Sequence, residues 1–172
     1  MKLINLVFVF LLSSCVVTAQ QNLGLKLPIG FKATLFADNI GMARHIAITQ
    51  NGVLYAKLMA PNKEGKAIIR LEDKNQDGVA ELISGFGNYG GTGIYVDGKN
   101  LYTSSDVAVF KYQLNEQDEV VNQTTPKTII KDLIAKNQHA SKSITLDGKG
   151  KIYVNIGAYS NACQENDRTK GS

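Results

Sequence analysis

The sequence has 172 residues, of which 44% are hydrophobic and 20% are charged, a balance typical of a folded globular protein and not of a disordered or fibrous chain. Its formal net charge of +4 comes from lysines and arginines spread along the whole length, and it contains no tryptophan. Because no run of five like charges occurs, the sequence indicates no nucleic-acid partner.

The first residues have the features of an export signal. Lys2 precedes an apolar run over residues 3–12, which has the length of a signal-peptide core and is too short to span a bilayer as a helix. Ala19 completes a small-residue cleavage pattern. We therefore expect a signal peptide over residues 1–19 and a mature domain over residues 20–172.

A lipoprotein processing motif, or lipobox, at the end of the same apolar run is the alternative to this cleavage site. Leu12-Ser-Ser-Cys15 resembles the bacterial motif whose cysteine is acylated, which would tie the protein to a membrane. Two valines follow Cys15 and make an unusual start for a lipoprotein linker, so cleavage after Ala19 is preferred. Both routes lead out of the cytoplasm, and we expect a periplasmic or secreted protein that contacts a membrane only if Cys15 is lipidated.

After residue 28, short runs of alternating apolar and polar residues dominate. These runs are rich in β-branched and aromatic residues, and turn residues bound them. None shows a helical period, so the sequence predicts an all-β chain. The expected strands cover residues 31–37, 45–49, 53–56, 67–71, 93–96, 101–103, 107–112, 127–130, 143–146 and 152–156.

One pattern recurs three times: an apolar strand, an Asn-Gly or Asp-Gly turn, and a second strand that contains tyrosine. The copies occupy residues 46–56, 94–103 and 144–154, and their tyrosines are 47 and 51 residues apart. Asn-Gly and Asp-Gly supply the positive φ angles of tight turns, so each copy is expected to be a hairpin. Second hairpins are expected over residues 67–83 and 107–121.

Two hairpins per repeat at this spacing predict the four-stranded blade of a β-propeller. Propellers close with about four to eight blades, whereas this sequence accounts for about two and a half. We therefore expect the N-terminal part of a longer propeller, because one blade cannot bury both of its faces alone. A sandwich of about eight to ten strands is the structural alternative, but it does not account for the repeat.

An acidic segment in the first repeat resembles the start of a calcium-binding loop. Asp73, Asn75 and Asp77 alternate and Gly78 follows, and oxygen ligands at alternate positions suit a hard cation. Position twelve, where an EF-hand has glutamate, is Ser84, and strands rather than helices are expected on both sides. The alternatives are a calcium site made by the three alternating residues and a polar hairpin loop without metal.

The two histidines differ in their surroundings. His45 alternates with Ile46 on an expected strand, and we expect it to be satisfied by a neighbour. His139 follows a polar turn and precedes the strand that begins near Ser143. Such loops line one end of a propeller's central channel, where binding residues collect. From the residues alone, His139 is either a catalytic base or an ordinary loop histidine.

The order of several segments points to a known family. They are Leu27-Pro-Ile-Gly-Phe-Lys32, Asn51-Gly-Val-Leu-Tyr55, the 73–81 loop, His139-x-x-Lys142, Asp147-Gly-x-Gly-Lys-Ile-Tyr-Val154, Ile156-Gly157 and Asn161-Ala-Cys-Gln-Glu165. Together they resemble the pyrroloquinoline quinone (PQQ)-dependent sugar dehydrogenases, in particular the L-sorbosone dehydrogenase-like branch related to soluble glucose dehydrogenase. The resemblance covers nearly all of residues 27–172 and implies the N-terminal part of a six-bladed propeller.

The resemblance implies roles for particular residues. A histidine at the position of His139 is the general base in that family: it takes the proton of the substrate hydroxyl while hydride passes to PQQ, whose quinone a calcium ion polarises. Lys142 would help to bind substrate or the carboxylates of PQQ. Ala158 stands where the glucose enzymes commonly have aspartate, whereas Asn161 and Cys163 match the sorbosone-like branch.

The expected function is therefore the oxidation of a sugar, aldose or aldehyde hydrate, with PQQ and Ca²⁺ as cofactors and an external electron acceptor. The alternative from another class is a non-catalytic extracytoplasmic propeller module for carbohydrate binding or protein interaction, since such folds host many functions. A third is a structural propeller stabilised by calcium at Asp73, Asn75 and Asp77. The 172-residue chain by itself is expected to be inactive and poorly soluble, because it exposes an unclosed blade edge.

Overall fold

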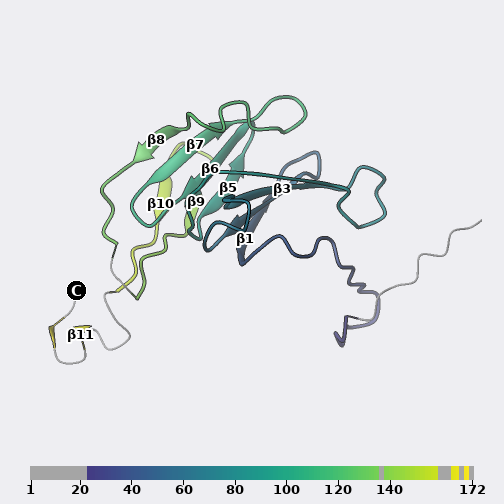
Figure 1. Cartoon of the computed structure of the whole chain (residues 1–172), viewed down its shortest axis with the longest axis horizontal. Coiled ribbons are helices and arrows are strands. Elements are labelled where there is room, and N and C mark those ends of the chain that lie inside the picture. The colour runs from purple at the N-terminus through teal and green to yellow at the C-terminus, as the bar shows by residue number, and fades with distance from the viewer. Residues whose placement is uncertain (1–22, 136–137, 159–163, 167–168, 171–172) are drawn as a thin grey trace, which may run out of the picture. The chain divides into compact units, whose positions relative to one another are not determined.

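The computed structural model describes residues 23–135, 138–158, 164–166 and 169–170 (Figure 1). The expected signal peptide, Cys15, Asn161 and Cys163 lie outside these residues, and export therefore stays a prediction. The chain divides into two units, residues 1–34 and 35–172. In the described part of the first unit the chain forms a turn, in which the Phe31 amide donates to the Pro28 carbonyl oxygen (3.1 Å).

The second unit is all-β in its described residues, as the alternating pattern predicts. Two four-stranded antiparallel sheets follow one another, each in the simple order of the chain. The first consists of β1 (Ala43–Ile48), β2 (Leu54–Leu58), β3 (Ile68–Glu72) and β4 (Leu82–Phe86), and the second of β5 (Ile94–Asp97), β6 (Asn100–Ser104), β7 (Val109–Gln113) and β8 (Lys127–Ile130). Two short pairs come next: β9 (Ile144–Leu146) with β10 (Ile152–Val154), and β11 (Gln164–Asn166) with β12 (Thr169–Lys170).

The three tight hairpins expected from the repeat are confirmed. β1 pairs with β2, β5 with β6, and β9 with β10, all antiparallel. Glycine lies in each connecting turn, and φ is +87° at Gly52, +55° at Gly98 and +68° at Gly148. Because side chains with a Cβ rarely adopt these angles, the Asn-Gly and Asp-Gly pairs direct the chain reversals.

Two of the sequence expectations are wrong in detail. Residues 31–37 form no strand; instead Phe36 and Ala37 pack against the first sheet, so the alternating apolar residues there serve packing and not strand pairing. The expected hairpin over 107–121 is reduced to one bridge between Leu114 and Val120, because β7 pairs with β8, which begins only at Lys127.

The sheets are joined by apolar clusters, as expected for stacked propeller blades. One cluster lies between the first and second sheets and includes Tyr55, Phe86 and Tyr112, whose rings meet edge to face. Another joins the second sheet to the β9–β10 pair through Tyr102 and Ile144. β1 contacts β5 and β5 contacts β9, so the first strands of successive blades are neighbours. Nearly complete burial of these side chains is the main stabilising term, worth about 1.5–3 kcal/mol for each large side chain.

The strands of each blade have two ends, and we name each end for the type of connection found there. The turn end carries the tight turns at Gly52, Gly98 and Gly148. The loop end is the opposite one, where β1, β5 and β9 begin and where β2, β6 and β10 finish. Loops that connect successive blades therefore meet at the loop end.

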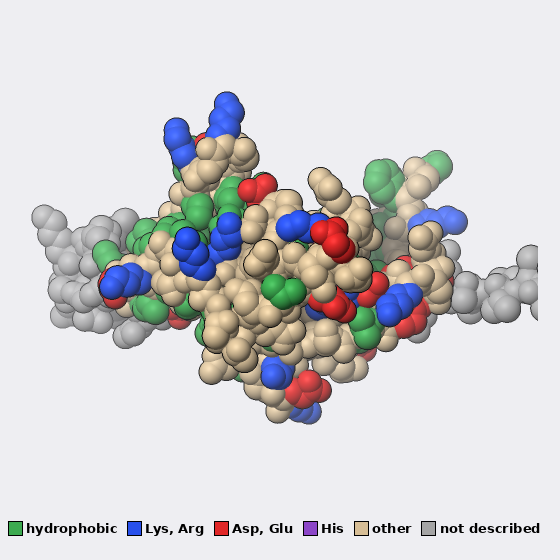
Figure 2. All heavy atoms as spheres, turned by 90° about the horizontal axis from the view of Figure 1, so that it is seen from above, with side chains coloured by type: hydrophobic (Ala, Val, Ile, Leu, Met, Phe, Trp, Pro, Cys, Tyr) green, Lys and Arg blue, Asp and Glu red, His purple; other side chains and the backbone are tan. Residues whose placement is uncertain are grey.

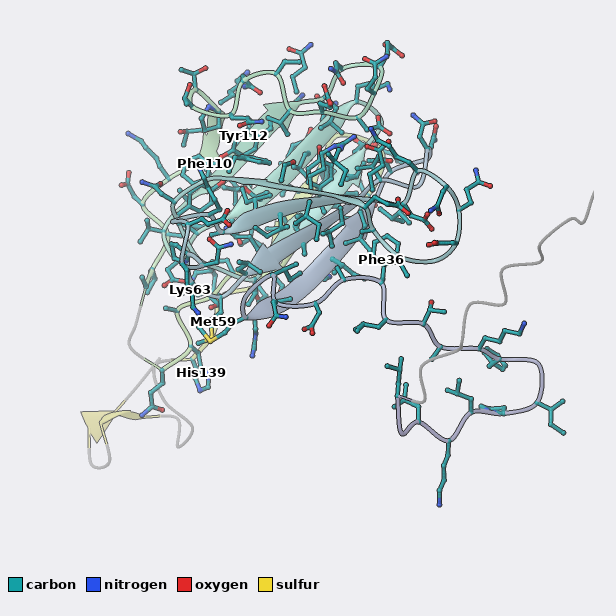
Figure 3. The ribbon with its side chains drawn as sticks, turned by 45° about the vertical axis from the view of Figure 1, so that its right-hand side comes forward. Phe36, Met59, Lys63, Phe110, Tyr112 and His139 are labelled. Carbon is teal, nitrogen blue, oxygen red and sulfur yellow. The ribbon has the colours of Figure 1, made fainter. Side chains whose placement is uncertain are left out.

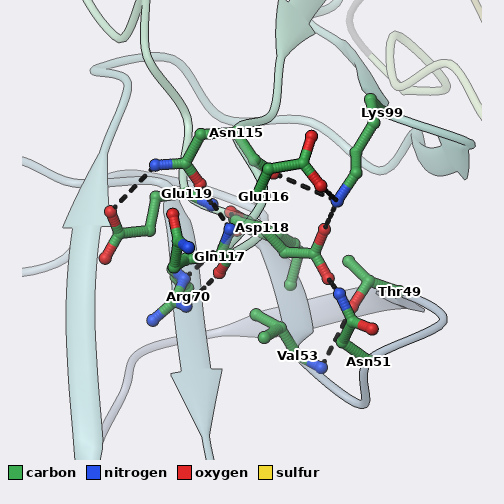
Figure 4. A network of polar contacts seen from close by, with 11 residues as sticks. Thr49, Asn51, Val53, Arg70, Lys99, Asn115, Glu116, Gln117, Asp118 and Glu119 are labelled. Atoms are coloured by element: carbon green, nitrogen blue, oxygen red, sulfur yellow. Dashed lines mark hydrogen bonds and ion pairs between the residues drawn. The ribbon is translucent and has the colours of Figure 1, made fainter.

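A polar clasp holds the first two sheets together at the turn end (Figure 4). Its centre is Asp118, which is 2% exposed and has a positive φ of 52°. The Asp118 carboxylate accepts hydrogen bonds from Asn51 Nδ2 (3.0 Å) and Lys99 Nζ (3.1 Å). Its backbone carbonyl accepts from the Tyr55 hydroxyl (2.5 Å) and Arg70 Nε (3.3 Å). Asn51, Tyr55 and Arg70 belong to the first sheet's part of the chain, so this clasp links two blades.

Figure 2 shows acidic and basic side chains interspersed over the described part of one face of the molecule, with apolar side chains between them. Positive and negative groups thus alternate there. No helix in the described residues is long and apolar enough to cross a membrane.

Candidate active site at the loop end

His139 lies at the loop end, in the segment that leads into β9, and its side chain is exposed. In Figure 3, His139, Met59 and Lys63 lie toward the same end of the ribbon. Topology accounts for this, since Met59 directly follows β2 and Lys63 belongs to the loop between β2 and β3. The structure therefore places His139 where loops from successive blades meet.

Gly157 packs closely against His139 within the same blade. It follows β10, which is antiparallel to β9, and so returns to the loop end beside the segment that precedes β9. A Cβ added at Gly157 would lie 2.6 Å from both the Cβ and the carbonyl oxygen of His139. Because no real Cβ approaches so closely, only glycine at position 157 leaves room for His139 where it is.

Lys142, to which the resemblance gave a binding role, lies in the segment between His139 and β9. Its side chain is completely buried, and Nζ donates a hydrogen bond to the carbonyl oxygen of Ala140. Burial lowers the pKa of Lys142, and the Asp106 carboxylate opposes this shift. The structure brings Lys142 next to His139 along the chain, but it directs the ammonium to the backbone.

A second buried lysine, Lys57 on β2, also lies toward the loop end. Nζ donates to the carbonyl oxygen of Tyr89 (2.5 Å) and sits 4.0 Å from the centre of the Tyr89 ring, a cation–π contact. Burial lowers the pKa of Lys57 to about 7, against an opposing effect of Asp106. Sequence reasoning missed Lys57, although alternation with Tyr55 on the same strand places it on a buried face.

Tyr89 extends this polar contact into the second sheet. Its hydroxyl lies 2.5 Å from Thr103 Oγ1 and 2.9 Å from the Tyr112 hydroxyl. Burial raises the pKa of Tyr89 above its ordinary value, so the hydroxyl is kept protonated and able to donate. Lys57 and Tyr89 therefore link the segment between the first two blades to β2 on one side and to β6 and β7 on the other.

His45 has the neighbour that the sequence analysis expected. Its Nδ1 is 3.1 Å from the carbonyl oxygen of Thr92, at the start of the second blade. Since a carbonyl oxygen only accepts, Nδ1 carries the proton in this contact. His45 therefore links the loop ends of two blades.

The acidic loop between β3 and β4 lies at the turn end, away from His139. The Asp73 carboxylate accepts hydrogen bonds from the amides of Asp77 (3.2 Å) and Gly78 (2.8 Å). Asn75 Oδ1 accepts from the Asp77 amide (2.9 Å), and Asp77 Oδ1 accepts from the Val79 amide (2.9 Å). These bonds are those of a side-chain-stabilised turn.

Glu81 adds a carboxylate that the sequence comparison with an EF-hand overlooked. One carboxylate oxygen from each of Asp73, Asp77 and Glu81 lies within 4.8 Å of the others. The EF-hand count looked for an acidic ligand only at position twelve, which is Ser84, whereas Glu81 comes three residues earlier, just before β4. The loop therefore offers three carboxylates to a cation, with Asn75 bonded to Asp77 through Nδ2 (3.2 Å).

Taken together, the described residues form part of a β-propeller with an exposed histidine at the end where its loops gather. The chain belongs to the TrAA12-like family, which matches residues 25–172. No curated protein matches the sequence.

Three solved structures are similar in fold. Two are structures of Trichoderma reesei carbohydrate-active enzymes family AA12: the iodide structure (TM-score 0.62, 20% identity, 74% of this chain and 33% of that chain) and the calcium structure (0.63, 20%, 74% and 32%). The third is the holo form of the pyranose dehydrogenase PQQ domain from Coprinopsis cinerea (0.59, 16%, 76% and 31%). This chain spans about a third of the length of these structures, and at such identities the likeness shows the fold.

Proposed function

We propose that this chain is part of a PQQ-dependent oxidoreductase that oxidises a sugar or related aldehyde hydrate, with His139 as the general base. The observation that carries the proposal is the exposed His139 at the loop end, in a position that only glycine at residue 157 leaves open. Membership of the TrAA12-like family and the fold shared with a pyranose dehydrogenase PQQ domain support it. The L-sorbosone dehydrogenase-like branch and export from the cytoplasm belong to the same proposal.

The residues at the loop end suit PQQ in chemical kind. PQQ carries several carboxylates, and cationic side chains bind carboxylates. Arg44 at the start of β1 and Lys63 after β2 are both exposed at this end. When bound, PQQ supplies the acceptor for the hydride that leaves the substrate carbon. Arg44 and Lys63 would hold its carboxylates, and the calcium structure of a relative supports Ca²⁺ as the second cofactor.

His139 would receive the proton from the substrate hydroxyl as the carbon–hydrogen bond breaks. An imidazole is a suitable base near neutral pH, and its position must be fixed to act on one hydroxyl. The backbone at Gly157 packs closely against that of His139, and the His139 side chain remains exposed.

The full-length protein, reconstituted with PQQ and Ca²⁺, tests this proposal through dye reduction over a panel of sugars and aldehydes. We expect turnover with at least one of them, and His139→Gln should lower kcat by about 10²–10⁴-fold while PQQ still binds. His45→Gln is the matched control and should retain most activity. Normal folding with no turnover on any substrate would favour the non-catalytic binding module, and unchanged turnover in His139→Gln would remove the role of this residue.

We also propose that Asp73, Asn75 and Asp77, together with Glu81, form a calcium site that is separate from the proposed PQQ site. It is supported by the grouping of three carboxylates within 4.8 Å. Calcium should then raise the melting temperature of the full-length protein, and chelation should reverse the effect. Asp77→Asn with Glu81→Gln should abolish this response. If wild type and variant respond equally to Ca²⁺, the metal does not bind this loop.

A further inference from the structure

Lys142 follows His139 by three residues in the sequence, yet its side chain is closed off from solvent. Its relative exposure is 0%, whereas His139 is exposed. A buried ammonium group is costly unless hydrogen bonds and an opposite charge compensate it. Nζ of Lys142 has the carbonyl oxygen of Ala140 as its acceptor, and Asp106 is the carboxylate that acts on its charge. This ammonium group therefore faces the backbone directly after His139.

The backbone of Lys142 is held from the neighbouring blade. The Ser104 hydroxyl at the end of β6 donates to the carbonyl oxygen of Lys142, and the Gly93 amide donates to Ser104 Oγ (2.9 Å). A Cβ added at Gly93 would lie 2.6 Å from the same Lys142 oxygen. The second blade therefore contacts the backbone of Lys142 so closely that position 93 has no room for a side chain.

The same segment is held from its own blade. The Ser143 amide donates to Asn155 Oδ1 (2.7 Å), and the Asn155 amide donates to the Ser143 carbonyl oxygen (3.1 Å). Two residues further on, Gly157 meets the backbone of His139. Residues 139–143 are therefore clamped between two blades, and the Lys142 ammonium group braces the segment from inside.

We infer that Lys142 is a positioning residue, which fixes the Ala140 carbonyl and with it the backbone that carries His139. It acts through His139 and does not touch substrate or cofactor. This role rests on the proposed function only in assigning catalysis to His139. It differs from binding of substrate or PQQ carboxylates, which needs an ammonium group that faces the site.

The test uses the full-length protein with Lys142→Met, which keeps the length of the side chain and removes the donor, and Lys142→Arg, which keeps a donor. We expect Lys142→Met to lower kcat at least about 10-fold, with KM and the Kd for PQQ changed less than about twofold, and Lys142→Arg to recover much of the loss. A rise of 10-fold or more in KM or in the Kd for PQQ at unchanged kcat would show a ligand contact and overturn the inference.

A readout that is independent of activity is the NMR signal of the His139 ring in protein labelled with ¹³C at histidine Cε1. His139→Gln assigns this signal. In Lys142→Met it should shift or broaden, while the His45 signal stays in place as the matched control. An unchanged His139 signal in a folded Lys142→Met protein would refute the positioning role.

Lys142→Gln covers the case in which Lys142→Met does not fold, because glutamine keeps a polar group in the buried position while its amide nitrogen stands one bond closer to the backbone than Nζ. The His139 signal should move in this variant as well, and an unmoved signal counts against the inference. If His139→Gln leaves turnover intact, the proposed function fails, and the ring signals still decide whether Lys142 positions His139.

Discussion

Asp118 shows how one residue can hold two blades together. Burial by itself raises the pKa of Asp118, but hydrogen bonds from Thr49, Lys99 and Asn51 outweigh burial and keep this pKa below its ordinary value. The carboxylate therefore remains charged in the folded protein at pH values where it would be partly protonated in the unfolded chain. Its charged form is the one that the clasp stabilises.

We predict that this carboxylate stabilises the fold fully above the ordinary pKa of aspartate, 3.8, and that the contribution is lost as the pH falls through the lower pKa of the folded state. Asp118→Asn should reduce the free energy of unfolding at pH 7 by about 1–3 kcal/mol, because asparagine keeps only one of the two acceptor oxygens and carries no charge. Thermal melting of the full-length protein between pH 3 and about pH 7 measures both effects.

Asp97→Asn serves as the control, since Asp97 is exposed in a tight turn of the second sheet. Its melting curve should follow that of the wild type over the whole pH range. Equal stability of Asp118→Asn and wild type at pH 7 would show that the clasp contributes little.

Gly157 gives a prediction about the position of His139. Gly157→Ala places a Cβ 2.6 Å from His139 Cβ and O, so the backbone of His139 must move. We expect kcat to fall at least about 10-fold while the melting temperature changes by only a few degrees. Gly98→Asn is the matched control: it adds a side chain in open space at the turn end, in a conformation that asparagine tolerates, and should keep wild-type kcat.

At the scale of the element, Lys57 and Tyr89 connect β2 to the loop that leads into the second sheet. The pKa of Lys57, about 7 in the folded protein, lies below its ordinary value of 10.5. Between these pH values the unfolded chain binds more protons than the folded one, so stability rises with pH in this range. Below pH 7 the full penalty for burying the charge is present.

We predict that Lys57→Met removes this pH dependence. The variant should gain stability relative to wild type at pH 6 to 7 compared with pH 10, since methionine fills the same space without a charge. Urea unfolding across this range measures the difference, with exposed Lys149→Met as the control. The same pH slope in wild type and Lys57→Met would contradict the assignment of the shifted group.

Strands and turns could be predicted where a few neighbouring residues determine them. The turns at Gly52, Gly98 and Gly148 could be read from adjacent residues, because two residues decide each reversal. β8 was predicted correctly as a strand. Its pairing with β7 was not predicted, because the register across the 114–126 connection depends on contacts between residues distant in sequence. The strand expected over residues 31–37 was wrong, because a segment that packs every second side chain against a sheet has the same sequence pattern as a strand within a sheet.

At the scale of the whole molecule, the candidate site was only partly predictable. His139 emerged from family resemblance, since no local pattern distinguishes a base from a loop histidine. Asp118 was missed because its partners Asn51, Tyr55 and Arg70 lie 67, 63 and 48 residues away in sequence. Lys142 was found, but its burial depends on contacts with Ser104 of another blade, which sequence spacing does not reveal.

This chain spans about a third of the length of its structural relatives, and we predict that it self-associates when expressed by itself. β1 is an edge strand, and Ile46 and Ile48 on it are 58% and 63% exposed. Light scattering coupled to size exclusion should show mixed oligomers for the isolated chain, and Ile46→Thr with Ile48→Thr should reduce them. A monodisperse isolated chain would disprove this prediction.

The clasp around Asp118 lies at the turn end of the first two blades, whereas the His139 segment lies at the loop end of the β9–β10 pair. Protein engineers often find that gains in heat tolerance reduce turnover, because stabilising changes stiffen the reacting region. In this protein, the residues that stabilise the fold around Asp118 and the residues around His139 lie at opposite ends of the blades. Libraries confined to the residues around the clasp can therefore select for thermal tolerance, while libraries around Gly157 and Gly93 vary the position of His139.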